Sequence, residues 1–221
     1  MQRINFNHVV VPITFPTTDQ TSTVSSDIIS LKNYRQADLY LANGVIGAAV
    51  AITLQQGALV AAAATSLSFT KYFSTGHLLK YDGASSDTPG AKGTYVTGAA
   101  GGISYIYEDL GGILVCYAQN GTAFVDNEVL TFSGGKTAVV DGTLYNEDIM
   151  VPRTASSDTF TIAAVTNKLY CIPVTSDMLT EGYTAVQIEI ASCSTVTHLC
   201  AWAILSEPRS MAEIPETVLY D

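Results

Sequence analysis

The sequence predicts an all-β protein: an antiparallel β-sandwich with an extended N-terminal arm and a glycine-rich insertion. Short segments in which apolar and polar residues alternate recur along the 221 residues, and turn dipeptides containing glycine separate them. Charged residues make up only 14% of the chain, against roughly 25% in soluble domains, whereas hydrophobic residues reach 48%. Regular short strands joined by such turns are typical of sandwiches.

Residues 1–27 are predicted to form an extended arm or an edge strand, in which the segment VVVPITF pairs with another strand. They are rich in Thr, Ser and Asn, and Pro12 and Pro16 exclude a helix and disfavour a central strand. Because so short a segment has little core of its own to bury, we expect it to lie on a neighbouring subunit or protein. The residues expected to make this contact are the apolar ones: Val9, Val10, Val11, Ile13 and Phe15.

The body of the sandwich is expected to comprise residues 28–75 and 151–221. Apolar residues alternate along 50–54 and again along 186–190, which is typical of half-buried strands. Residues 44–64 are uncharged and could be mistaken for a membrane helix. Two glutamines and a glycine in the middle of that segment would be costly in lipid, so two buried strands joined by a turn are expected instead.

Residues 76–150 are predicted to form a β insertion or protruding lobe rich in glycine and tyrosine. Turn dipeptides such as Asp82-Gly83 and Asn120-Gly121 indicate hairpins with exposed tips. Tyr105 and Tyr107 are two residues apart and therefore share one face of a strand. That pair could contact a sugar or a partner protein, or it could lie at the edge of the core.

The net charge limits the classes of partner that the chain could bind, and the cysteines indicate the compartment in which it is made. A net charge of −10 with only 10 Lys and Arg argues against nucleic acid and against an anionic membrane surface. The four cysteines form no CxxC motif and are expected to be buried free thiols, although a disulfide remains possible. The N-terminal residues do not resemble a signal peptide, so synthesis in a cytoplasm is expected.

No residue pattern indicates catalysis. The three histidines form no metal-binding motif, and no GxSxG nucleophile elbow is present. Carboxylates at 108–109, 126–128 and 147–148 are interpreted as solvated turn residues, with a weak Ca²⁺ or sugar site as the alternative. We therefore expect no enzyme activity, no catalytic residues, no metal site and no cofactor.

Two parts of the chain resemble structural proteins of tailed-phage virions. One is SLKNYRQADLYLANGVIGAAVAITLQQ with the following SLSFTKYF; the other is DTFTIAAVTNKLYCIPVTSDML with GYTAVQIEIAS and LCAWAILSEPR. Together they span 28–73 and 158–209, and the rest of the chain carries no such resemblance.

The resemblance implies a decoration, cement or minor capsid protein on the virion's capsid surface. Its partners would then be the major capsid protein and further copies of itself, arranged as a homotrimer. The main alternative is a head-fibre, tail or spike component whose lobe binds host glycans. A cellular carbohydrate-binding module and a hydrolase on a β scaffold are further alternatives.

Overall fold

The computed structural model divides the chain into two compact units. One, the body, comprises Met1–Phe73 and Pro152–Asp221, and the other, the lobe, comprises Ser74–Val151. The lobe is thus inserted into the body, and the sequence had suggested 76–150 for it. The structure describes residues 8–17, 21–58, 64–86, 88–120, 123–142, 145–162, 167–193, 197–209 and 219–220.

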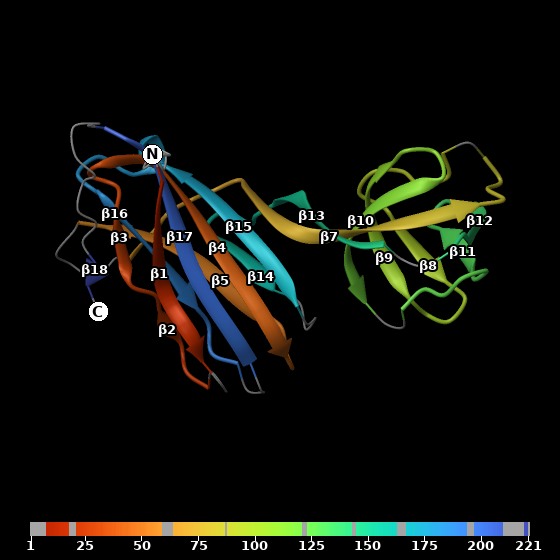
Figure 1. Ribbon diagram of the computed structural model, residues 1–221, viewed down its shortest axis with the longest axis horizontal. Helices are drawn as coiled ribbons and strands as arrows, with labels where there is room; N and C mark the ends of the chain where they lie inside the picture. The colour runs from red at the N-terminus through yellow and green to blue at the C-terminus, as the bar shows by residue number, and fades with distance from the viewer. Residues whose placement is uncertain are drawn as a thin grey trace, which may run out of the picture. The chain divides into compact units, whose positions relative to one another are not determined.

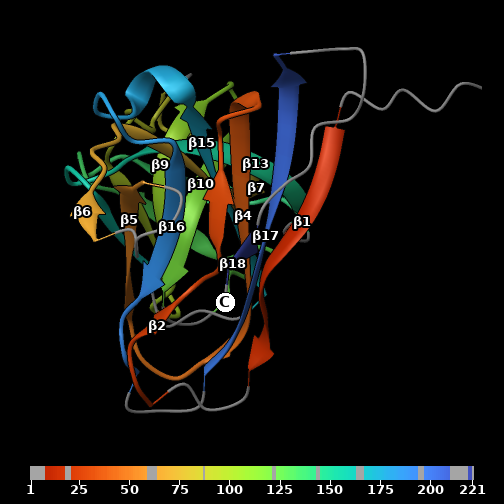
Figure 2. The same cartoon turned by 90° about the vertical axis from the view of Figure 1, so that its left-hand side faces the viewer.

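The body contains two antiparallel sheets (Figures 1 and 2). The first sheet begins with the order β1 (His8–Thr17), β17 (Thr197–Pro208), β4 (Tyr34–Ile46) and β15 (Lys168–Thr175), and it continues through β7 (Lys71–Asp82). The second has the order β14 (Thr159–Ile162), β5 (Val50–Gly57), β16 (Ala185–Ile190), β3 (Ile28–Ser30) and β18 (Leu219–Tyr220). Two short strands extend it: β2 (Val24–Ser25) pairs with β16, and β6 (Thr65–Ser66) pairs with β5. A short 3₁₀ helix, η1 (Ser176–Met178), follows β15.

The order of the strands is that of a jelly roll. The principal strands in chain order are β1, β3, β4, β5, β14, β15, β16 and β17, and the first, eighth, third and sixth of these form one sheet. The second, seventh, fourth and fifth form the other, as in the double Greek key of jelly rolls. The predicted all-β sandwich is therefore confirmed, and the lobe is inserted between the fourth and fifth of these strands.

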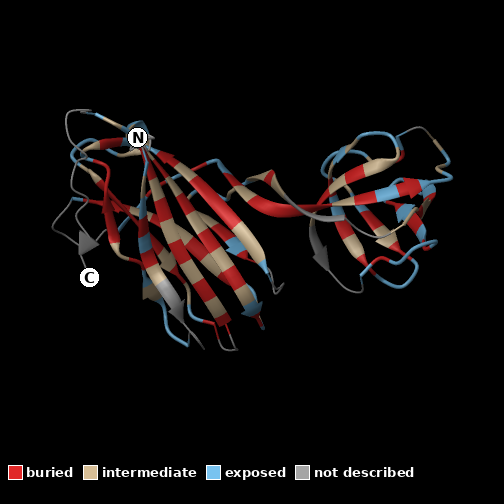
Figure 3. Cartoon of the chain, viewed as in Figure 1, coloured by how far each residue is buried: buried red, intermediate tan, exposed pale blue. Residues whose placement is uncertain are grey.

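The core of the body lies between its two sheets. Burial alternates along the strands, which Figure 3 shows as red and tan bands on β4 and β17. Leu39 and Leu41 of β4 and Ile188 of β16 are at most 1% exposed. Alternation of apolar residues with period two thus determines which face of each strand is buried.

The described part of residues 1–27 forms an edge strand, one of the two predicted forms, and it pairs within its own chain instead of with a neighbouring subunit. Strand β1 pairs antiparallel with β17 of the same chain, and β2 pairs with β16. Val11 and Ile13 are only 3% and 2% exposed and belong to the core of the body. The alternation of Val9, Val11 and Ile13 gives β1 an apolar face, so the segment has a core to bury after all.

The structure describes the first part of the uncharged segment 44–64. Strand β5 runs over Val50–Gly57 and ends at the two glutamines and the glycine, as predicted for the first strand of the pair, while most of the second predicted strand falls on residues 59–63. Residues 59–63 lie outside the described residues. Within the described part of the chain, no helix is long and apolar enough to cross a membrane.

The lobe is a closed antiparallel sheet. Its strands follow the order β7 (Lys71–Asp82), β10 (Ile113–Asn120), β9 (Ile103–Asp109), β8 (Tyr95–Gly98), β11 (Val129–Phe132) and β12 (Thr137–Val140). Strand β12 pairs back with β7, which closes the ring, and β13 (Tyr145–Thr154) also pairs with β7. The side chains that point into the ring form a separate core that includes Leu79, Ile106, Leu114 and Phe132.

Candidate interaction surfaces

The outward face of the first sheet of the body, formed by β1, β17, β4 and β15, is mostly apolar. We call it the outer face. One cross-strand row runs Pro12, Trp202, Tyr40 and Cys171, and the next runs Val10, Ile204, Asp38 and Pro173. Only Asp38 in these two rows carries a charge.

Two rings mark the centre of the outer face. Tyr40 and Trp202 stack with their centroids 5.6 Å apart and their planes 7° from parallel. Both side chains are half-buried, and Val10 beside them is 63% exposed. Tyrosine and tryptophan at the centre of an apolar surface are typical of protein interfaces. The outer face is therefore the best candidate on the body for a protein contact.

The structure divides the predicted contact residues of β1 between two environments. Val10 points outward and belongs to the outer face, whereas Val11 and Ile13 point into the core. Val9 is half-buried and packs against that core. The side chain of Phe15 lies outside the described residues. Of the five residues, Val10 is thus the one that the structure shows at the surface.

The cysteines are free thiols, and at least two have raised pKa values. Burial raises the pKa of Cys116 in the lobe to about 12. Burial, with the nearby Asp38 carboxylate adding to it, raises the pKa of Cys171 to about 11. Burial and the adjacent Cys171 also raise the pKa of the Tyr40 hydroxyl. These groups stay protonated at neutral pH, so neither thiol is an activated nucleophile.

This difference in burial predicts selective thiol labelling. At pH 8 iodoacetamide should modify half-buried Cys200 in the native protein and leave Cys116 and Cys171 unmodified, because burial denies access and disfavours their thiolates. Peptide mass spectrometry before and after unfolding in urea measures this. All four cysteines should react once the chain is unfolded, and modification of native Cys116 at the rate of Cys200 would contradict the prediction.

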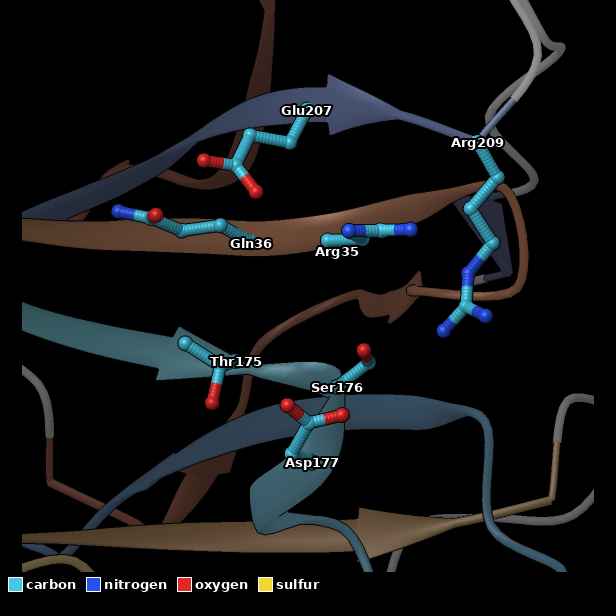
Figure 4. Close-up of a pocket in the computed structure, with 7 residues that line it drawn as sticks. All are labelled: Arg35, Gln36, Thr175, Ser176, Asp177, Glu207 and Arg209. Atoms are coloured by element: carbon cyan, nitrogen blue, oxygen red, sulfur yellow. The ribbon is translucent and has the colours of Figure 1, made fainter.

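A polar pocket of about 290 Å³ lies where β4 begins and where β15 and β17 end (Figure 4). Its lining is Arg35, Gln36, Thr175, Ser176, Asp177, Glu207 and Arg209. The two arginines balance the two carboxylates, so its net charge selects neither anions nor cations. The sequence did not indicate this pocket, because its residues come from three separate segments.

The lobe carries a row of three tyrosines across adjacent strands. Tyr105 of β9 is paired with Tyr95 of β8 on one side and with Tyr117 of β10 on the other. The ring centroids of Tyr95 and Tyr105 are 6.4 Å apart, and those of Tyr105 and Tyr117 are 5.8 Å apart with planes 17° from parallel. Tyr95 is 45% exposed and Tyr105 is 37% exposed. We call these three residues the tyrosine row.

Tyr105 and Tyr107 share the outward face of β9, as the sequence predicted, but they have different neighbours. Tyr105 is the middle member of the tyrosine row, whereas Tyr107 is half-buried with the ammonium of Lys92 4.1 Å from its ring centroid. Tyr95 and Tyr117 were missed because cross-strand register, which a single sequence does not specify, brings them to Tyr105. Tyr40 and Trp202 were missed for the same reason.

Several carboxylates bind backbone rather than solvent. Glu128 is only 7% exposed and accepts hydrogen bonds from the backbone N–H groups of Ala100, at 2.5 Å, and Val125, at 3.1 Å. Asp109 accepts from the hydroxyl of Tyr81 at 2.7 Å and from the N–H of Gly90 at 2.8 Å. The interpretation of these residues as solvated is therefore wrong for Glu128 and Asp109. The side chains of 147–148 lie outside the described residues.

One serine and one histidine form a buried pair in the lobe. The Oγ of Ser104 lies 2.9 Å from the Nε2 of His77, and the two residues are 0% and 1% exposed. A nucleophile and its base must reach a substrate, and this pair is enclosed inside the ring. Among the described residues, no three His, Cys, Asp or Glu side chains are grouped so that they could hold a metal ion.

The fold defines a class: a jelly-roll protein with a closed β lobe inserted into it. No protein-family model matches the chain, and no curated protein does. Among solved structures, the chain is similar to one described as the structure of infectious bursal disease virus Gx strain, at 11% identity and a TM-score of 0.16. The alignment covers 97% of this chain and 44% of that one, so this chain spans less than half of that protein's length. A likeness at this TM-score carries no argument.

Proposed function

We propose that this chain is a non-catalytic structural protein of a virus particle, a decoration or minor capsid protein that binds the major capsid protein and stabilises the shell. The observation that carries the proposal is the jelly-roll order of the body strands, an architecture common in viral capsid proteins. Lectins and cupins share that architecture, so the fold alone does not determine the function. The resemblance of 28–73 and 158–209 to tailed-phage virion proteins favours the virion.

The outer face supports the attachment step of this proposal. Its central Tyr40–Trp202 pair and exposed Val10 offer an apolar surface that a capsid protein could cover. Burial of apolar area stabilises by about 25 cal/mol per Å², and a repeating shell multiplies each contact. In this account the contact is made by the outer face of β1, while the inner face of β1 stays in the core.

The proposal also covers the net charge of the protein and its oligomeric state. A net charge of −10 disfavours contact with packaged nucleic acid. The resemblance implies a homotrimer at the capsid surface, and synthesis in the host cytoplasm before assembly. Light scattering of the purified protein at rising concentration tests the oligomeric state.

The test is cosedimentation of the purified protein with expanded, DNA-free heads of the virus that encodes it. We expect saturation at a copy number comparable with that of the major capsid protein. Val10→Asp should lower the affinity by about tenfold or more, because a charge would enter an apolar contact. Leu110→Asp is the matched control, since Leu110 is 59% exposed and lies in the lobe. Saturation at only enough copies for the vertices, or equal binding of both variants, would contradict the proposal.

A further inference from the structure

The tyrosine row lies beside a second row that presents hydroxyl groups. Thr97 of β8 is two residues from Tyr95 and on the same side of the strand. It pairs directly with Thr131 of β11, and Thr131 pairs with Thr137 of β12. Thr131 and Thr137 are exposed, and the intervening residues of these strands, such as Val96 and Leu130, point into the core. The two rows therefore meet on β8, from which the tyrosines extend over β9 and β10 and the threonines over β11 and β12.

This surface carries no charge in either row, and the lobe around it is acidic. Residues 74–151 contain three lysines against nine carboxylates and no arginine, a net charge of −6. Lys80 forms an ion pair with Asp141 at 2.7 Å, and Lys92 lies over the ring of Tyr107. An anionic ligand such as a nucleic acid or an acidic polysaccharide would meet repulsion here.

From these features we infer that the tyrosine and threonine rows of the lobe form a binding site for a neutral polysaccharide. A sugar ring has an apolar C–H face that packs on an aromatic ring and an edge of hydroxyls that exchange hydrogen bonds with other hydroxyls. The two rows offer both kinds of contact, and they meet at Tyr95 and Thr97 of β8. Three rings in line across β8, β9 and β10 match a chain of several sugar units better than a single one.

A neutral glycan fits better than a protein partner. Exposed tyrosines also occur in protein interfaces, but there the charged rim usually provides complementarity. Here neither the tyrosines nor the threonines that continue from Thr97 carry a charge. The site does not rest on the proposed attachment to a capsid, because its residues belong to the lobe and the outer face belongs to the body.

Affinity electrophoresis of the full-length protein in native gels tests the inference. The gels contain hydroxyethyl cellulose, laminarin, dextran or yeast mannan as neutral probes, and alginate or heparin as anionic ones. At least one neutral polysaccharide should retard the protein, and neither anionic one should. Tyr105→Ser should weaken the retarding interaction by about tenfold, the scale of one lost aromatic contact, whereas Tyr105→Phe should stay close to the wild type.

Two further variants distinguish a loss of binding from a loss of folding. Thr97→Val keeps the shape of the side chain and removes one hydroxyl, so it should weaken retardation without altering the thermal melt. Val125→Ser is the control, since Val125 is 56% exposed and outside both rows. Absence of retardation by every neutral probe, stronger retardation by alginate or heparin, or equal retardation of Tyr105→Ser and Val125→Ser would overturn the inference. Tyr105→Ser should still cosediment with heads, which keeps this result separate from that of the proposed function.

Discussion

Leu39→Ala should destabilise the body by about 2–5 kcal/mol. Leu39 is 0% exposed in β4, which lies between β17 and β15, so truncation leaves a cavity that the two sheets cannot readily fill. Folded domains are stable by only about 5–15 kcal/mol, so this loss is a large fraction of the total. Trp202 is the one tryptophan of the chain and lies in β17, so its fluorescence during urea unfolding reports on the body.

Val10→Ala is the control for that experiment. Val10 lies in the same sheet and is 63% exposed, so its truncation should change the free energy of unfolding by less than about 0.5 kcal/mol. Equal urea midpoints for Leu39→Ala and the wild type would mean that the two sheets do not pack through Leu39. The assignment of the core of the body would then be wrong.

Gly76→Ala should destabilise the lobe by about 3 kcal/mol or more, because no space exists for a methyl group. A Cβ at Gly76 would lie 2.5 Å from the backbone carbonyl oxygen of Cys116 and would overlap the side chain of Val151. Relief requires movement of β10 away from β7, which would open the closed sheet. Hydrogen–deuterium exchange measured by mass spectrometry should show faster exchange across 74–151 and unchanged exchange in the body.

The matched substitution is Gly134→Ala in the same lobe. Nothing lies within 4 Å of a Cβ built at Gly134, so this variant should be as stable as the wild type, or slightly more stable because the unfolded chain loses freedom. Similar exchange for Gly76→Ala and Gly134→Ala would contradict the close packing of β7 against β10.

Local patterns predicted much of the fold. Alternation along β5 and β16 and the turn dipeptides with glycine were enough for an all-β sandwich. For β1 the two prolines left an arm and an edge strand open, and the expected partner was a neighbouring subunit. Pro12 is exposed at the edge of the sheet, next to β17, where a missing N–H costs little. Whether such a strand pairs within its own chain depends on a partner about 190 residues away, as with Val11 and Ala203.

The candidate surfaces were less predictable than the fold. Tyr105 could be selected from one strand, but its neighbours Tyr95 and Tyr117 reach it only through the register of three strands. The role of Glu128 was hidden in the same way, because the N–H group of Ala100 that it binds comes from a different turn. Sequence therefore indicated the kinds of residue involved, and three-dimensional pairing determined which of them act together.

Cryo-electron microscopy of heads saturated with this protein tests the central claim most directly. We expect density for a jelly-roll body at regular positions on the outside of the shell. The outer face should be turned toward the major capsid protein, with Trp202 and Tyr40 at the contact. The contradicting result is an ordered body whose outer face is exposed to solvent, or heads that carry no density for the protein at saturating concentration.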